Sequence, residues 1–321
     1  MNELIFDVDN ARLISRILTL YYQEDKSQGE IGNLLGLSTA KVNRLIKYAR
    51  EMGMVEININ PPFKNLFDLE NKFEESSGVN TAIIVPHLTD DPNTTIQQVG
   101  AAAARYLEGH LRDGDTITMG GGRALSEMVQ ALNAGHHFDV KVVPATGGVQ
   151  GRHYTDTNNL AAEAARKLGG TSFQLHAPAY TDTPEERNAF LALRHVKDIL
   201  DLSRKAQVAV CGIGALSLDT SSYLQFSGLS NADLKHIQTD DCGIGEILAQ
   251  VINSEGEPCA RKYSDRVIGL SVEELRTIPL TIGLAATSEK VAPIAAALKG
   301  HYFKTIVTDE ITALEVLKHF N

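Results

Sequence analysis

Apolar residues recur at helical spacing through the first fifty or so residues, and short polar segments interrupt the pattern twice. The spacing predicts helices over 11–22, 28–35 and 39–52. Ser27 followed by Glu30 has the spacing of a capping box, which indicates that the second helix begins at residue 28. Gly36 is placed to end that helix in a left-handed conformation, and Ser38 is a good N-cap for the third helix. This layout is typical of a helix-turn-helix.

The second and third helices each have an apolar face. In the second helix, Ile31, Leu34 and Leu35 are expected to face the core. In the third helix the apolar positions follow i, i+3, i+4 and i+7, which predicts one buried stripe. Its members are Val42, Leu45, Ile46 and Ala49. The basic side chains of the third helix lie off this stripe and face solvent or a partner.

That basic helix belongs to an acidic chain, with 30 Lys and Arg against 40 Asp and Glu and a formal net charge of -10. The surface as a whole therefore disfavours nucleic acid, and any contact with DNA must be local. A solvated basic face is the alternative interpretation. The tight turn and the polar residues at the helix start favour DNA recognition, in which early residues reach base edges and Lys or Arg hold phosphates. The predicted DNA-binding residues are Gln28, Ser38, Thr39, Lys41, Asn43, Arg44 and Lys47.

A change of pattern after residue 52 predicts a domain boundary. Apolar and polar residues alternate over 55–59, which predicts a short wing or exit strand. Pro61 and Pro62 then stop regular structure. An amphipathic segment over 66–76, with Leu66, Phe67 and Leu69 among its apolar residues, predicts a connecting helix. We therefore expect a DNA-binding domain over 1–60 and a second domain over 61–321.

The rest of the chain alternates apolar runs with helical patterns. Short polar or glycine-containing loops follow most of the runs, so the pattern predicts an α/β fold with a doubly wound parallel sheet. Ligands bind such sheets at the carboxyl ends of the strands. The predicted strands are 81–87, 115–122, 141–148, 172–179, 207–214, 280–287 and 304–310.

One of these strand ends predicts an anion site. The run MGGGRALSEMV places glycines and a basic residue between a strand and a helix. Exposed N–H groups and the positive end of a helix dipole bind anions there, whereas a turn that needs glycine for steric reasons is the alternative. The run has neither the ending of a P-loop nor the spacing of a dinucleotide fingerprint. The candidate residues are Gly120, Gly121, Gly122, Arg123 and Ser126.

Three further segments carry candidate ligand contacts. Thr287, Ser288 and Lys290 follow another strand, and a lysine at a helix start is unfavourable unless an anion lies nearby. Gly147 and Gly148 fit a turn as well as they fit a contact. The run DDCGIGE was interpreted as a glycine turn whose carboxylates coordinate a metal, act as acid and base, or bind sugar hydroxyls. Its candidates are Asp240, Asp241 and Glu246, and metal binding is the least favoured because no histidine accompanies them.

Other patterns exclude several classes of protein. No apolar run approaches the length of a membrane span, and the acidic N-terminus does not resemble a secretory signal, so the protein is expected to be cytoplasmic. Cys211, Cys242 and Cys259 form no CxxC pair, which argues against a zinc site or a disulfide framework. No nucleophile motif is present. We expect no cofactor, no metal and no catalytic residue.

The chain resembles the SorC-type, sugar-responsive bacterial transcription regulators. The resemblance rests on LYYQEDKSQGEIGNLLGLSTAKVNRLIKYAREMGMVEI near the start and RVIGLSVEELRTIPLTIGLAATSEKVAPIAAALKGHYFKTIVTDEITALEVL near the end, with DGDTITMGGGRALSEMV, VVPATGG and DDCGIGEI between them. It implies a winged helix-turn-helix joined to an effector domain similar to sugar-phosphate isomerases and glucosamine-6-phosphate deaminase. It also implies a tetramer that responds to a phosphorylated sugar.

Carried over by motif, the resemblance places Gly121, Gly122, Arg123 and Ser126 at a phosphate loop. It implies that Lys290 contacts the phosphate and that Glu246 binds sugar hydroxyls. VVPATGG has Thr146 where some members have an arginine, which favours an effector with one phosphate. Two alternatives remain open: an active sugar-phosphate enzyme that uses Asp240 or Asp241, and an oligomeric binding protein that does not bind DNA.

Overall fold

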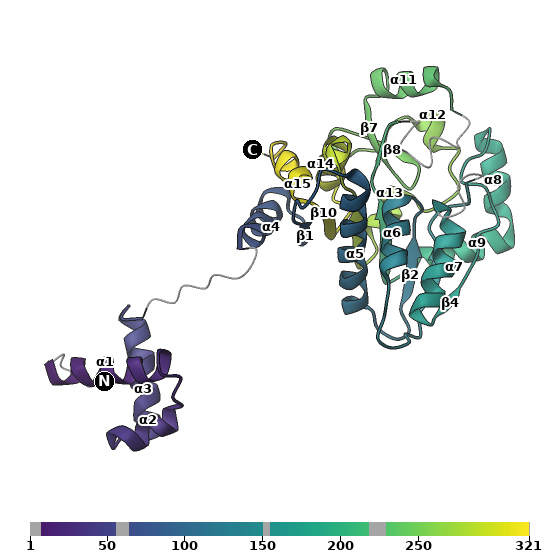
Figure 1. The fold of residues 1–321 in the computed structure, drawn as a ribbon. Helices are drawn as coiled ribbons and strands as arrows, with labels where there is room; N and C mark the ends of the chain where they lie inside the picture. Colours follow the sequence, from purple (N-terminus) through teal and green to yellow (C-terminus); the bar gives the residue numbers. More distant parts are fainter. Residues whose placement is uncertain (1–7, 56–63, 150–154, 218–228, 321) are drawn as a thin grey trace. The chain divides into compact units, whose positions relative to one another are not determined.

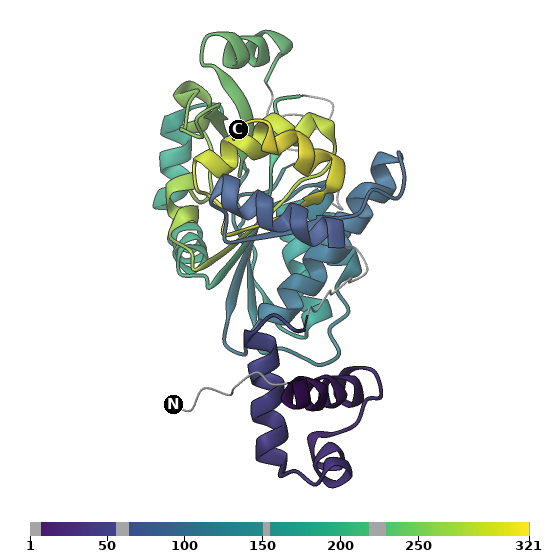
Figure 2. The same ribbon diagram turned by 90° about the vertical axis from the view of Figure 1, so that its left-hand side faces the viewer.

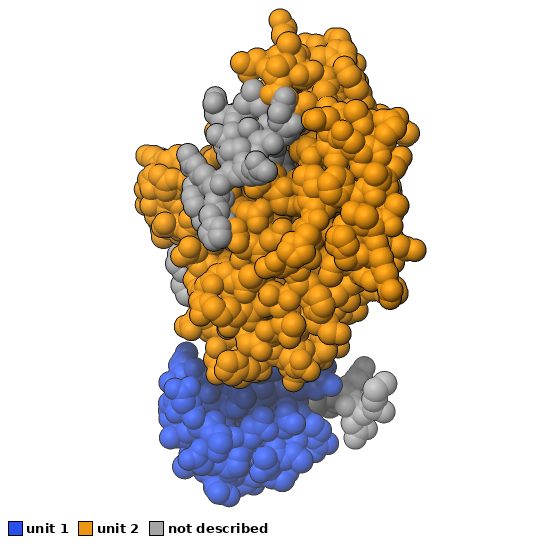
Figure 3. Space-filling view, turned by 90° about the vertical axis from the view of Figure 1, so that its right-hand side faces the viewer, with its two compact units in different colours: residues 1–62 blue, residues 63–321 orange. Residues whose placement is uncertain are grey.

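The computed structural model describes residues 8–55, 64–149, 155–217 and 229–320, and the chain divides into two compact units. Unit 1 is Met1–Pro62 and unit 2 is Phe63–Asn321, coloured blue and orange in Figure 3. The predicted strand over 55–59 lies almost entirely outside the described residues.

Unit 1 contains α1 (Val8–Tyr22), α2 (Gln28–Leu35) and α3 (Thr39–Glu51). The capping box forms as predicted, with Glu30 N–H donating to Ser27 and Ser27 N–H donating to Glu30 (2.9 Å for the latter). Gly36 ends α2 at φ +66°, in the left-handed conformation that glycine adopts without strain. The local signals therefore fix the turn between α2 and α3.

The core of unit 1 confirms most of the predicted apolar pattern. All four residues of the α3 stripe are buried, and Ile31 of α2 packs with them and with Ile17 of α1. Leu34 was predicted to face this core, but it is 62% exposed. The reason is that α2 is only two turns long, and the side of it that contacts α1 and α3 carries Ile31 and Gly32.

Unit 2 is built on a seven-stranded sheet whose strand order is β1-β10-β9-β5-β2-β3-β4 (Figure 1). Every adjacent pair in this sheet is parallel, as the repeated strand–loop–helix pattern predicted. The strands are β1 (Thr81–Val85), β2 (Thr116–Met119), β3 (Lys141–Pro144), β4 (Thr171–Ser172), β5 (Val208–Gly212), β9 (Leu280–Leu284) and β10 (Thr305–Asp309).

Helices cover both faces of this sheet, and each face has its own hydrophobic cluster. One cluster contains residues of α5 (Pro92–His110), α6 (Arg123–Ala131) and α7 (Thr157–Leu168). The other contains residues of α4 (Lys64–Ser77), α13 (Val272–Arg276), α14 (Val291–Lys299) and α15 (Glu310–Leu317). The remaining helices described in unit 2 are α8 (Pro184–Ala192), α9 (Arg194–Arg204), α11 (Asn231–Thr239) and α12 (Arg261–Ser264).

A second, antiparallel sheet was not predicted. It contains β6 (Gly214–Ala215), β7 (Gly243–Ile247) and β8 (Gln250–Asn253). Its middle strand, β7, is the run GIGEI, which was interpreted from the sequence as a glycine turn; that interpretation is wrong. Gly245 is required there because a Cβ would lie 2.8 Å from Pro293 of α14, so only glycine lets the strand pack so closely on the helix.

The predicted strand over 172–179 is also mostly wrong, because only Thr171–Ser172 is a strand. The side chain of Asn158 in α7 takes both backbone groups of Leu175: it accepts from the N–H (2.8 Å) and donates to the carbonyl (3.3 Å). A side chain thus replaces the neighbouring strand as the hydrogen-bond partner, and the segment leaves the sheet.

Helix α4 is more than the predicted connection, because it closes the edge of the large sheet. Strand β1 is an edge strand, and its outward N–H groups at Ala82 and Ile84 donate to Glu74 and Glu70 of α4 (2.8 Å each). Capping exposed strand edges in this way prevents unwanted pairing with other chains. On the same helix Phe67, predicted to be part of the apolar face, is 53% exposed.

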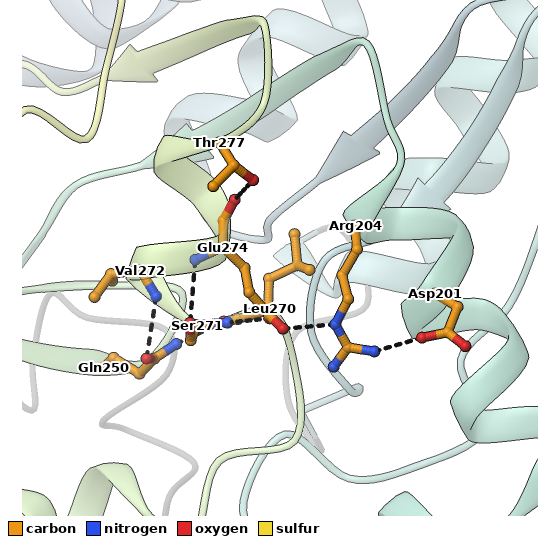
Figure 4. Close-up of polar contacts among 8 residues, drawn as sticks. All are labelled: Asp201, Arg204, Gln250, Leu270, Ser271, Val272, Glu274 and Thr277. Carbon is orange, nitrogen blue, oxygen red and sulfur yellow. Dashed lines mark hydrogen bonds and ion pairs between the residues drawn. The ribbon is translucent and has the colours of Figure 1, made fainter.

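An ion cluster fixes elements that lie next to the starts of β5 and β9 (Figure 4). Arg204 at the end of α9 donates to Glu274 of α13 (2.6 Å) and to Asp201 (2.7 Å). Glu274 also accepts from the N–H of Ser271, which caps α13 (2.9 Å). Since these side chains are about one-third exposed, the cluster contributes through geometry more than through charge.

The crossing of α5 and α6 gives a test of this packing. A Cβ at Gly100 would lie 2.7 Å from the backbone of α6 at Glu127, whereas a Cβ at Gly109 of the same helix meets nothing within 4 Å. We expect Gly100→Ala to lower the free energy of unfolding by about 1–3 kcal/mol through overpacking. Gly109→Ala should raise it by about 0.5–1 kcal/mol through helix propensity. Urea unfolding of both variants checks this; equal effects would contradict the close crossing.

Candidate effector site and candidate DNA surface

The strand order of the large sheet reverses between β2 and β5. The chain continues from β2 to β3 on one side, and it returns to β5 and moves on to β9 on the other. Because all these strands are parallel, the loops after β2, β5 and β9 lie at one edge of the sheet. Such a reversal opens a crevice at the carboxyl ends of the strands, which is where α/β proteins bind ligands.

The loop after β2 is the predicted glycine run. The N–H of Gly120 donates to Val210 of β5 (2.9 Å), which continues the sheet by one residue. Gly122 has φ +114° and precedes α6 without any side-chain cap. The first N–H groups of a helix have no partner within the helix, so this end is suited to an anion. Arg123 hydrogen-bonds to Asn93 at the start of α5, and Ser126 is buried.

The loop after β9 supplies a second uncapped helix start. Ser288–Lys290 form a short 3-10 helix, η2, that leads into α14, and neither begins with a side-chain cap. Thr287 has φ +85° and ψ 155°, a conformation that costs a non-glycine residue about 1–3 kcal/mol. The surroundings must therefore hold this loop in place.

Lys290 is the cation of the site, and its side chain is 14% exposed. Burial lowers the pKa of Lys290, and the nearby carboxylates Glu289 and Glu246 oppose that shift. The Glu289 carboxylate lies 3.7 Å from the ammonium group. A mostly buried lysine at such a strand-to-helix junction is suited to bind an anion.

Glu246 lies on the small sheet, close enough for its charge to act on the pKa of Lys290. It is 4% exposed and accepts a hydrogen bond from the N–H of Ala249 (3.0 Å). Its strand partner is Gly214, just beyond the end of β5. A buried carboxylate beside a buried ammonium can bind hydroxyl groups while the ammonium binds a phosphate. The fold thus brings Glu246 and Lys290 together from segments more than forty residues apart.

Gly147 and Gly148, two other predicted ligand contacts, form hydrogen bonds within the protein. The N–H groups of Gly147 and Gly148 donate to the carbonyls of Ile268 and Ala177 (2.9 Å each), so this turn uses its donors for packing. Thr146 is fully buried against Thr157. A ligand contact by Gly147 or Gly148 stays a prediction.

Asp241 precedes β7 and lies 3.8 Å from His236 of α11, whereas Glu246 is near the far end of the strand. Asp240 also bonds to His236 (2.6 Å), and its hydrogen bonds to Thr239 and His236 lower its pKa.

Sequence reasoning missed two residues at this edge. Asn93 contacts Arg123, and Asp309 accepts a hydrogen bond from the N–H of Thr287 (2.9 Å). Asn93 lies two residues after Asp91, which caps α5, and Asp309 is itself the cap of α15. The sequence shows the caps, but it does not show that these helix starts meet the loops after β2 and β9.

The predicted DNA surface lies on α3 of unit 1. The side chains of Lys41, Asn43 and Arg44 are exposed, and so is Thr39 at the helix start. Ser38 is used as the helix cap, accepting from the N–H of Lys41 (3.2 Å). Lys47 lies 3.8 Å from Glu51. Gln28 begins α2 and is half-buried.

Among the described residues, no helix is long and apolar enough to cross a membrane. The same residues contain no group of three His, Cys, Asp or Glu side chains that could hold a metal ion. Cys211 at the end of β5 is fully buried, and burial raises its pKa to about 12. That thiol is therefore a packing residue in a site with no thiolate nucleophile.

The fold and site define a two-part ligand-binding protein with a helical N-terminal unit and a doubly wound α/β unit. Residues 61–318 match the family described as a putative sugar-binding domain, and the chain belongs to that family. This membership agrees with the resemblance to SorC-type regulators found in the sequence.

Named relatives extend the match over both units. The chain is 28% identical to the deoxyribonucleoside regulator of Bacillus subtilis (strain 168), with 96% of this chain and 97% of that protein covered. It is 29% identical to the sorbitol operon regulator of Klebsiella pneumoniae, with 97% and 99% covered. The crystal structure of the full-length sorbitol operon regulator SorC from Klebsiella pneumoniae aligns with a TM-score of 0.75 at 28% identity, over 97% of this chain and all of that one.

The lowered pKa of Lys290 predicts opposite pH dependences for stability and for anion binding. Between the lowered pKa and the ordinary value of 10.5, the unfolded chain carries more protons, so the free energy of unfolding should rise with pH. Phosphate affinity should fall over the same window, because neutral Lys290 has no charge to pair.

Calorimetric titration with inorganic phosphate upward from about pH 8, where phosphate is already a dianion, checks the second half of this prediction. Lys290→Arg is the matched control, since a guanidinium stays charged and should flatten the profile. A profile that is the same for both proteins would remove Lys290 from the anion site.

Proposed function

We propose that this protein is a transcriptional regulator of a carbohydrate-utilisation operon, which binds operator DNA through unit 1 and a phosphorylated sugar or polyol through unit 2. The names of its relatives support the regulatory role, and its family supports a sugar-type effector. The observation that carries the proposal for the effector is the buried ammonium of Lys290 beside Glu246, next to uncapped starts of η2 and α14.

The charges of the side chains determine which part of the proposed effector each would bind. The phosphate binds Lys290, the N–H groups of Ser288 and its neighbours, and the Gly121–Arg123 loop across the crevice. The hydroxyl groups bind Glu246, because a carboxylate accepts hydrogen bonds and repels phosphate. An effector with one phosphate fits this arrangement, since Thr146 adds no second cation.

We also propose that the effector is bound and released unchanged. The acid–base carboxylates considered from the sequence, Asp240 and Asp241, are placed with His236 at the start of β7. An enzyme acting on the sugar would need such a group within hydrogen-bond reach of the reacting carbon. Incubation with a panel of pentose and hexose phosphates, followed by NMR of the small molecules, tests this proposal; conversion of any of them would favour the enzyme.

On the DNA side, α3 is proposed as the recognition helix. Helix-turn-helix proteins bind paired half-sites as dimers or larger assemblies, so a homo-oligomer is proposed, with a tetramer as the family expectation. Residues near the start of α3 would read bases and the later lysines would hold phosphates.

Removing the proposed phosphate partner should abolish the effector response. For the sugar phosphate that stabilises the wild type in a thermal-shift screen, a concentration of 100 times the dissociation constant corresponds to about 2.7 kcal/mol. Lys290→Ala should lose most of this stabilisation and keep its fold. Lys299→Ala, at the other end of α14 and ion-paired with Glu255, is the matched control. If both variants keep the wild-type response, the phosphate assignment is wrong.

The DNA surface is tested by removing one exposed arginine from each unit. Arg44→Ala should weaken operator binding by about 1–3 kcal/mol if the side chain reads a base. Arg194→Ala, an equally charged change on the surface of α9, should leave it unchanged. Gel-shift titration at one fixed salt concentration measures both. Equal affinities for the wild type and Arg44→Ala would exclude this side chain from the interface.

A further inference from the structure

A hydrogen bond from Thr287 links the loop after β9 to Asp309. The Thr287 N–H donates to Oδ2 of Asp309 at 2.9 Å, and the Thr287 φ of +85° lies in the left-handed half of the map, which disfavours a side chain. Asp309 itself is 5% exposed at the end of β10. A buried carboxylate therefore holds the strained residue from which η2 and Lys290 follow.

The same carboxylate begins helix α15. Oδ1 of Asp309 accepts from the N–H of Thr312 at 3.0 Å, and Oδ2 accepts from its hydroxyl at 2.6 Å. One side chain thus serves the loop after β9 and the N-terminus of α15 together. Any movement of Thr287 that breaks the first bond removes one donor from the carboxylate that also caps α15.

Helix α15 in turn packs on α4, as Figures 1 and 2 show. Ala313, Val316 and Leu317 of α15 belong to the same hydrophobic cluster as three buried residues of α4. Those three residues are Leu66, Leu69 and Phe73. Helix α4 is also the first described element that follows unit 1 in the sequence, and it holds the edge of β1 through Glu70 and Glu74.

We propose that Asp309 is a positioning residue that couples the effector loop to α4. It sets the conformation of Thr287 that presents Lys290, and through the cap of α15 it links this conformation to the docking of α4 on β1. The proposal rests on the proposed function for its ligand. It adds Asp309 and the contacts of α15 as a connection between the proposed effector site and α4. Helix α4 follows the proposed DNA-binding unit in the sequence.

The test uses a substitution that separates the two bonds of Asp309. Asp309→Ser keeps a good N-cap for α15, since serine and aspartate cap equally well, but its side chain is too short to reach Thr287 as well. Asp309→Asn keeps one acceptor oxygen and should behave between the wild type and Asp309→Ser. Ser271→Ala is the control, because it removes the cap of α13 next to the start of β9, away from the loop.

Hydrogen exchange of the full chain without ligand gives the first readout. The amides of Ala82 and Ile84 report the docking of α4, because their bonds go to Glu74 and Glu70. In Asp309→Ser, exchange should be faster by about tenfold or more in 285–290 and also in 64–85. In Ser271→Ala both segments should match the wild type. Faster exchange in 285–290 alone, or no change in either, overturns the coupling.

Inorganic phosphate is the probe for the second readout. It should slow exchange in 285–290 and alter exchange in 64–85 of the wild type, while in Asp309→Ser the second change is lost and affinity falls by about tenfold. Retention of the 64–85 response in Asp309→Ser overturns the inference. If phosphate does not bind the wild type, the proposed function fails, and the ligand-free exchange alone then decides the role of Asp309.

Discussion

The parallel pairing of β5 with β2 on one side and β9 on the other determines where the chemistry of unit 2 can lie. Parallel strands end at the same edge, so three loops from distant parts of the sequence meet there. Two of those loops lead into helices without side-chain caps at this edge of the sheet. In the function proposed here, the backbone geometry of this edge favours an anion before any charged side chain is added.

The side chains then make this site selective. Lys290 adds a charge that the crevice does not neutralise fully, and Glu246 adds an acceptor that repels phosphate. Their placement depends on the small sheet, because Gly245 allows β7 to pack closely against Pro293 of α14. An anion with hydroxyl groups satisfies both residues at once, whereas a bare anion satisfies only the lysine. A strongly negative total charge is therefore compatible with the proposed negatively charged ligand.

The parts of the structure that depend on local signals could be predicted from the sequence. Capping boxes, a left-handed glycine and helical spacing located α2 and α3 within a residue or two, and the strand–loop–helix alternation identified the parallel sheet. The failures involve contacts between distant segments. Nothing near Leu175 reveals that Asn158 will take its backbone groups, and nothing near GIGEI reveals that β8 will pair with it.

The residues of the candidate site also fall into two groups, those that the sequence pattern predicts and those that depend on contacts between distant segments. Lys290 and the Gly121–Arg123 loop follow strands of one parallel sheet, so topology alone places them at the same edge of that sheet. Asp241 and Glu246 are close in sequence, yet an extended strand separates them, because short sequence distance guarantees proximity only in helices and turns. Asp309 could be predicted as a helix cap, but its bond to Thr287 depends on the register of β9 and β10.

The electrostatics of the ligand-free site also bear on how ligand binding shifts the protein between two conformations. A ligand shifts a conformational equilibrium only by the difference between its affinities for the two states. In the free protein, Lys290 is partly desolvated and Thr287 is strained, so this arrangement of the loop is costly without a ligand. In the proposed mechanism, phosphate binds this arrangement of the loop more tightly than a relaxed one, because here it pairs with Lys290. We therefore propose that the difference in affinity arises where the loop meets Asp309, which is also where α15 begins.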